Sequence, residues 1–127
     1  MKAMLPDSLV IHSKKHYLPM VFDSEENKLA TQRYMETQRP YATNLPDNID
    51  FIRRNNELRS RDEILAAVEK TPFSILASSG YMGLPVMITI DQRKRITVPK
   101  TKPSRTITPA GALGTGGITS AVYPVES

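Results

Sequence analysis

The sequence contains no cysteine and no tryptophan among its 127 residues. Without cysteine, the chain cannot form disulfides, zinc–thiolate sites, iron–sulfur clusters or a cysteine nucleophile. Tyrosine and phenylalanine make up only 6% of the residues, so large side chains that could anchor a core are few. The hydrophobic fraction is 39%, against about 45–50% for typical globular domains when glycine is counted. These shortages predict one modest domain with a small core.

Long hydrophobic runs are also missing. No segment approaches the roughly 18 consecutive apolar residues of a membrane span, and the N-terminus lacks the continuous apolar stretch of a signal peptide. We therefore predict no membrane partner and a location in a virion or in the cytoplasm.

Charge is distributed unevenly along the chain. Residues 1–50 carry six basic and seven acidic side chains, whereas residues 51–127 carry eleven basic and six acidic ones. The densest cluster is an acid-free run of six basic residues, namely Arg93, Lys94, Arg95, Lys100, Lys102 and Arg105. A run of this kind is typical of a solvated surface or of a contact with phosphates or with an acidic protein.

Two helices and three strands are predicted. Acidic residues and a proline stop favour a helix over 24–38, and a capping pattern with an apolar stripe favours another over 60–70. Short apolar or alternating runs predict strands over 73–77, 85–90 and 95–98. Segments 39–56 and 100–127 hold most of the prolines and glycines and read as extended.

This pattern predicts an α+β fold, with a small helix plus an antiparallel three-stranded unit flanked by extended arms rich in proline and glycine. We expect an N-terminal arm with one polar helix over 1–56, a small α+β core over 57–99 and an extended C-terminal tail over 100–127.

Extended arms are typical of proteins that dock onto neighbours in large assemblies. We therefore predict a structural or adaptor subunit of a virus or phage particle, such as a minor head, tail or cement protein. Its partners would be other protein subunits, including copies of itself. The predicted partner-docking residues are the apolar side chains of the two arms: Leu18, Met20, Phe22, Tyr41, Val122, Tyr123 and Val125.

A second hypothesis starts from the strand–turn–strand pattern over 88–100, ITIDQRKRITVPK. This stretch resembles the hairpin of the AbrB/MazE-like DNA-binding family, whose intertwined dimers bring basic loops to DNA. The resemblance implies a nucleic-acid-binding module in which the six basic residues listed above are candidate phosphate contacts. Such binding would depend strongly on salt.

The side chains that usually carry catalysis are sparse. His12 and His16 are two residues with helical zinc-site spacing, but lysines separate them and the local pattern is extended, which favours surface histidines. The glycines of 111–117 lack the Gly-Lys-Ser/Thr of a phosphate loop. We therefore predict no enzymatic activity, no catalytic residues, no metal and no cofactor.

Overall fold

The computed structural model describes residue 10 and residues 12–80, 82–105 and 107–127. The first half of the chain forms three helices, α1 (Glu25–Thr37), α2 (Asn48–Asn55) and α3 (Arg61–Glu69). The second half forms the strands β1 (Phe73–Ser78), β2 (Pro85–Thr89), β3 (Leu113–Gly116) and β4 (Thr119–Val122), with a short 3-10 turn at Gln92–Lys94. The predicted α+β class with an antiparallel sheet is confirmed.

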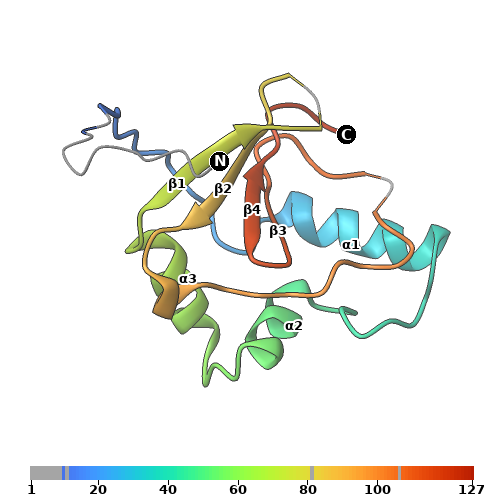
Figure 1. Cartoon of the computed structure of the whole chain (residues 1–127). Coiled ribbons are helices and arrows are strands. Elements are labelled where there is room, and N and C mark those ends of the chain that lie inside the picture. Colours follow the sequence, from blue (N-terminus) through green and yellow to red (C-terminus); the bar gives the residue numbers. More distant parts are fainter. Residues whose placement is uncertain (1–9, 11, 81, 106) are drawn as a thin grey trace, which may run out of the picture.

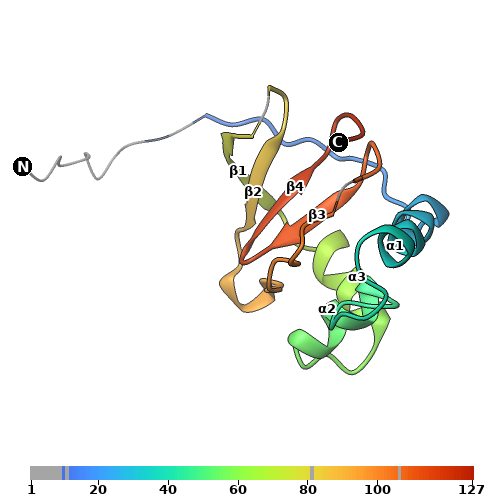
Figure 2. The same ribbon diagram turned by 90° about the vertical axis from the view of Figure 1, so that its right-hand side faces the viewer.

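The strands make a four-stranded sheet in the order β1-β2-β4-β3, and every pair is antiparallel. Figure 1 shows β1 at one edge of the sheet and α1 near the opposite edge, beside β3. Helices α2 and α3 lie together beyond one end of the strands. The quarter-turned view in Figure 2 places all three helices on the same side of the sheet.

Local chemistry explains where the helices begin. Ser24 precedes α1, and its hydroxyl accepts a hydrogen bond from the backbone N–H of Asn27. Asp47 precedes α2, and its carboxylate accepts from the N–H groups of Ile49 and Asp50 at 2.8 and 3.1 Å. The predicted helices over 24–38 and 60–70 are confirmed within one residue at each end. Helix α2 lies in a range predicted to be extended, because its Asp47 cap was read as a turn signal.

The predicted third strand over 95–98 is wrong. The backbone N–H of Arg95 is bonded within the 3-10 turn, and the N–H of Thr97 donates to the side chain of Asn56 rather than to a strand. Only Val98 pairs with the sheet, through a single bridge to Gly117.

The C-terminal segment supplies the strands that the sequence did not predict. Strands β3 and β4 form a hairpin around a two-residue loop at Gly117 and Ile118, and β4 also pairs with β2. Gly117 has a φ of +63°, which suits the first position of such a loop. The sheet thus has four strands rather than three, and two of them lie in the predicted tail. The division at residues 56 and 99 remains a prediction.

The core is small, as the composition predicts. Its buried apolar residues come from both halves of the chain: Tyr34, Ile64, Leu84, Val98 and Ala112. Strand β1 contributes little to it, because Ile75 and Leu76 are 64% and 59% exposed. Within the described ranges, no helix is long and apolar enough to cross a membrane.

Candidate functional site

A large hollow lies between helices α1 and α2 and the β3–β4 hairpin. It has a volume of about 860 Å³ and is lined on a third side by residues 98–101, 104, 105 and 108. The lining combines apolar side chains such as Ile49 and Val86 with hydroxyl, amide and cationic groups. A mixed lining of this kind is typical of sites for small polar ligands.

Two glycines of β3 shape one wall of this cavity. A Cβ atom at Gly114 would lie 2.9 Å from Cε2 of the Tyr123 ring, and one at Gly116 would lie 3.3 Å from Cγ of Lys100. Residues two apart in a strand face the same side of the sheet. The absence of both side chains therefore leaves a track on β3, along which the Tyr123 ring and the Lys100 stem lie.

The segment that carries the basic residues of this wall is fastened to α1. The hydroxyl of Tyr34, which is 4% exposed, donates to the carbonyl of Pro103 at 2.7 Å. Nη1 of Arg39 donates to the carbonyl of Lys102 at 3.1 Å. These two bonds hold the segment that brings Arg105 to the cavity. Neither bond could be predicted from local sequence, because the partners lie more than 60 residues apart.

Arg105 is partly buried at this wall. Burial lowers the pKa of its guanidinium from the usual value, while the nearby phenol groups of Tyr123 and Tyr34 act in the opposite direction. Among the described residues, no ion pair joins Arg105 to a carboxylate. A partly buried cation without a carboxylate at ion-pair distance creates a site that favours an anion.

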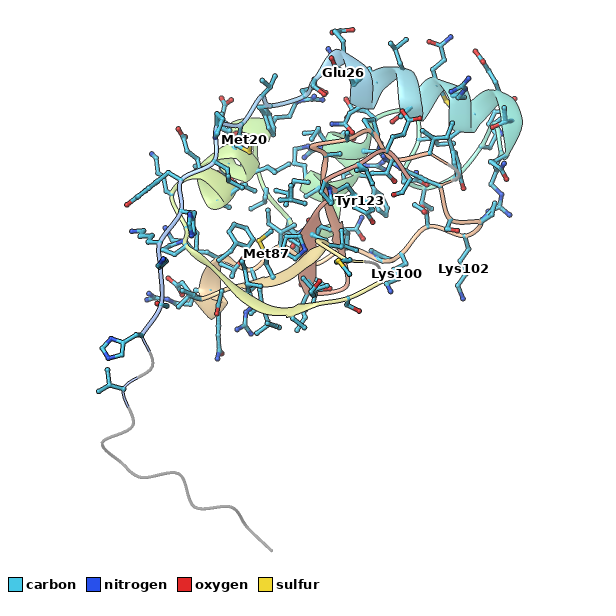
Figure 3. The ribbon with its side chains drawn as sticks, turned by 90° about the horizontal axis from the view of Figure 1, so that it is seen from above. Met20, Glu26, Met87, Lys100, Lys102 and Tyr123 are labelled. Carbon is cyan, nitrogen blue, oxygen red and sulfur yellow. The ribbon has the colours of Figure 1, made fainter. Side chains whose placement is uncertain are left out.

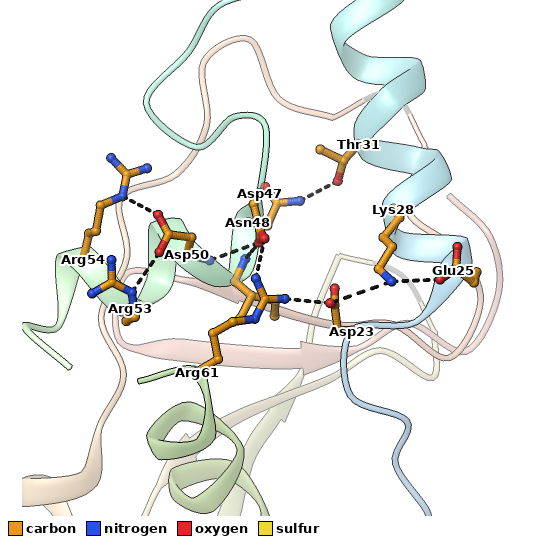
Figure 4. Close-up of polar contacts among 11 residues, drawn as sticks. Asp23, Glu25, Lys28, Thr31, Asp47, Asn48, Asp50, Arg53, Arg54 and Arg61 are labelled. Carbon is orange, nitrogen blue, oxygen red and sulfur yellow. Dashed lines mark hydrogen bonds and ion pairs between the residues drawn. The ribbon is translucent and has the colours of Figure 1, made fainter. Parts of the chain in front are cut away.

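The carboxylates that line the far side of the cavity are already engaged by basic residues (Figure 4). Arg61 at the start of α3 bonds Asp23 through Nη2 at 2.6 Å and Asp47 through Nη1, and Lys28 lies 3.8 Å from Asp23. Nearby, Asn48 donates to the hydroxyl of Thr31 at 2.6 Å. This network joins the segment before α1 to the first turns of α2 and α3.

The same network predicts a dependence of stability on pH. Burial raises the pKa of Asp47, but bonds from the Asp50 N–H and from Arg61 outweigh it, so the pKa lies below its usual 3.8. A carboxyl whose pKa is lower in the folded state stabilises the fold above its unfolded pKa and loses this effect as the pH falls through its folded pKa. We expect Arg61→Met to lower the free energy of unfolding by about 1 kcal/mol at pH 7, since these pairs are partly exposed. This difference from the wild type should shrink below about pH 4.

Chemical denaturation at pH 7 and at pH 3.5 measures both effects. Arg59→Met, at an exposed position two residues earlier, is the matched control and should change stability little at either pH. A loss in Arg61→Met that is the same at both pH values would show that the Asp47 pair does not contribute.

The six predicted phosphate contacts do not form one surface. Arg93 is exposed and pairs with Asp91 at 3.0 Å, and Lys94 is exposed beside it in the 3-10 turn. The guanidinium of Arg95 donates to the carbonyl of Thr89 at 3.1 Å. By contrast, Lys100 and Arg105 line the cavity. In Figure 3 Lys102 lies at the periphery of the molecule, away from the centrally placed Tyr123.

The predicted docking residues also separate into two groups. Four of them are exposed on the surface: Leu18, Met20, Tyr41 and Val125. The other three are partly buried: Phe22, Val122 and Tyr123. Tyr123 lines the cavity, so its role in docking stays a prediction that competes with a role in this site. His12 and His16 are both exposed in a segment without regular structure.

Comparisons with known proteins place the chain among enzymes. The family model described as "Carboxyltransferase domain, subdomain C and D" matches residues 4–127. The chain is 42% identical over 117 residues to the putative urea carboxylase of Emericella nidulans, which covers 92% of this chain. It is 37% identical over 111 residues, or 87% of its length, to the urea amidolyase of Saccharomyces cerevisiae. The crystal structure of the K. lactis urea amidolyase superposes with a TM-score of 0.80 and 33% identity over 85% of this chain.

The relatives are much longer than this chain. It spans 9% of the length of the Emericella nidulans protein and 6% of the Saccharomyces cerevisiae and K. lactis proteins. The similarity thus concerns one small part of each of these enzymes.

These matches overturn three predictions. The chain is not a subunit of a virus or phage particle, nor an AbrB/MazE-like nucleic-acid-binding module, and the prediction of no enzymatic activity is contradicted by its relationship to a carboxyltransferase domain. The prediction of viral assembly partners fails with them. The predicted C-terminal tail is not an extended arm. Residues 113–122 form two of the four strands of the sheet, and residues on either side of them line the cavity.

Proposed function

The chain belongs to the family of carboxyltransferase domains, subdomains C and D, and from this premise we propose that it forms part of the carboxyltransferase domain of a urea-carboxylating enzyme. The observation that carries the proposal is the match of the family model along residues 4–127. The names of the relatives supply the acceptor, which is urea.

The chemistry of this transfer sets requirements that the cavity meets. A nitrogen of urea attacks the carboxyl carbon of an activated donor, a C–N bond forms, and the nitrogen loses a proton while the donor leaves with the electron pair. The acceptor is a small neutral amide, whereas the product carries a carboxylate. Amide and hydroxyl side chains such as Asn44, Asn48 and Thr31 suit the neutral amide of urea. The cations Lys100 and Arg105 suit the carboxylate of the product.

A chimeric enzyme tests this function. We expect that residues 4–127, exchanged for the matching segment of the Saccharomyces cerevisiae urea amidolyase, support urea-dependent carboxylation within roughly tenfold of the parent enzyme. The measurement is the incorporation of labelled bicarbonate that requires urea. The matching segment of the K. lactis urea amidolyase is the control graft. A soluble chimera without activity, beside an active control graft, would contradict the proposal.

We also infer that the partners of the chain are other parts of the same enzyme. Within the part of the chain that the structure describes, strand β1 pairs only with β2, and its residues from Ser74 to Ser78 are exposed on both faces of the strand. An open edge with exposed apolar side chains is suited to cover by further polypeptide. In the chimera, the backbone amides of β1 should therefore exchange with solvent deuterium more slowly than in the free chain.

A further inference from the structure

We propose that Arg105, Lys100 and Tyr123 form a binding site for a small planar carboxylate, the group that the product of urea carboxylation carries and urea lacks. The inference rests on the proposed function and assigns part of the cavity to one end of the ligand.

Three side chains from two segments of the chain line this wall. Arg105 and Lys100 come from the segment that follows Val98, and Tyr123 follows β4. Figure 3 shows Tyr123 near the centre of the molecule and Lys100 on the same side of it as Lys102. Two cations and a phenol can together give a carboxylate several hydrogen bonds, and the guanidinium can bind both of its oxygens.

Hydrogen bonds hold the backbone at Tyr123 and close to Arg105 before any ligand arrives. Gly111 donates to the backbone carbonyl of Tyr123 at 2.6 Å, and the N–H of Tyr123 donates to Ala112 at 3.0 Å. The bond from Tyr34 to Pro103 fixes the chain two residues before Arg105. Preorganised donors lose little conformational entropy when they bind a ligand.

The acids of the cavity do not compete for Arg105. Asp23 and Asp47 both bond Arg61, and Asp23 also lies close to Lys28. The titratable groups that influence the pKa of Arg105 are instead the phenols of Tyr123 and Tyr34. The guanidinium is thus placed to bind an anion from outside the chain.

Direct binding measurements on the full 127-residue chain test the site. Malonamate is a stable analogue of carboxylated urea with a methylene in place of one N–H, and malonamide is its uncharged counterpart. Calorimetric titration should show that malonamate binds and that malonamide binds at least tenfold more weakly. Arg105→Met should weaken malonamate binding roughly 10- to 100-fold. Arg105→Lys keeps the charge but loses the planar guanidinium, so its affinity for malonamate should lie between those of the wild type and Arg105→Met.

Further variants separate a site from a general loss of structure. Lys100→Met, at an exposed side chain, should weaken binding by less than Arg105→Met does and leave the thermal midpoint unchanged. Arg93→Met removes an equal charge outside the cavity and should leave binding unchanged. Equal binding of malonamate by the wild type and by folded Arg105→Met, or no binding by the wild type, would overturn the inference.

Bicarbonate distinguishes the source of the carboxylate. Binding of bicarbonate alone, still dependent on Arg105, would overturn the assignment to the carboxylated product and would show that Arg105 binds free bicarbonate instead. The chimera separates this inference from the proposed function. If the chimera is active and malonamate inhibits its Arg105→Met variant as strongly as the unsubstituted chimera, the carboxylate site is refuted and the proposed function stands. An inactive chimera with Arg105-dependent malonamate binding by the chain refutes the function alone.

Discussion

Replacing Ile64 with alanine should lower the free energy of unfolding by about 2–5 kcal/mol. Ile64 is 2% exposed and is the buried residue of α3. It adjoins a second hollow of about 430 Å³ that is also lined by Ile49 and Ile52 of α2 and by Phe22. The alanine variant loses the transfer free energy of the removed carbon atoms, and it enlarges a space that the neighbours already fail to fill. Chemical denaturation of the full chain measures the change.

Leu29→Ala is the matched control for this substitution. Leu29 lies in α1 and is 64% exposed, so truncating it removes a comparable side chain without opening a cavity. We expect a change within about 0.5 kcal/mol. Equal losses in the two variants would mean that Ile64 does not anchor α3 to α2 and to the segment before α1.

The helical half of the fold was open to prediction because its signals are local. Capping groups, acidic first turns and proline stops lie within a few residues of the helix ends, and they placed α1 and α3. Helix α2 was missed although Asp47 caps it, since the prolines and asparagines around it also suit a loop. Local propensity could not decide between the two, and the packing of α2 against α3 in the folded chain did.

The hairpin of β3 and β4, unlike the helices, could not be predicted from local signals. Its sequence, LGTGGITSAV, is rich in glycine and reads as a flexible spacer. In the structure, the glycines of the hairpin have different structural roles. Gly117 turns the chain, while Gly114 and Gly116 make room for side chains that lie on the strand. This need arises from residues that lie elsewhere in the sequence, so composition alone misread it.

The residues of the candidate site were predicted separately and for other roles. Lys100, Arg105 and Tyr123 were singled out, the first two as phosphate contacts and the third as a docking residue. The sequence could show that these side chains are charged or aromatic, but it could not show that they face one cavity. The bond from Tyr34 to Pro103 and the track on β3 bring them together, and both depend on tertiary structure.

The track on β3 leads to the second large expected effect. Gly114→Ala should lower the free energy of unfolding by about 1–3 kcal/mol, which is the usual cost of adding a methyl group to a packed site. The new Cβ would lie 2.9 Å from the Tyr123 ring, a distance that requires the ring to move. Backbone bonds to Gly111 and Ala112 hold Tyr123, so the ring can give way only by rotating out of its place. Malonamate binding should weaken as well, because the phenol leaves the wall that it shares with Arg105.

Gly116→Ala is the comparison that makes this result specific. It adds the same methyl group to the same face of the same strand, but the nearest atom is 3.3 Å away in the flexible stem of Lys100. That stem can shift by a few tenths of an ångström, and alanine restricts the unfolded chain more than glycine does. We therefore expect Gly116→Ala to be neutral or to stabilise the chain by up to about 1 kcal/mol. If both variants lose the same stability, strand β3 tolerates no side chain at either position. The stability cost of the methyl group would then not depend on whether its neighbour is the Tyr123 ring or the flexible Lys100 stem. If only Gly114→Ala loses stability and binding, the packing of the Tyr123 ring against Gly114 is what shapes the carboxylate site.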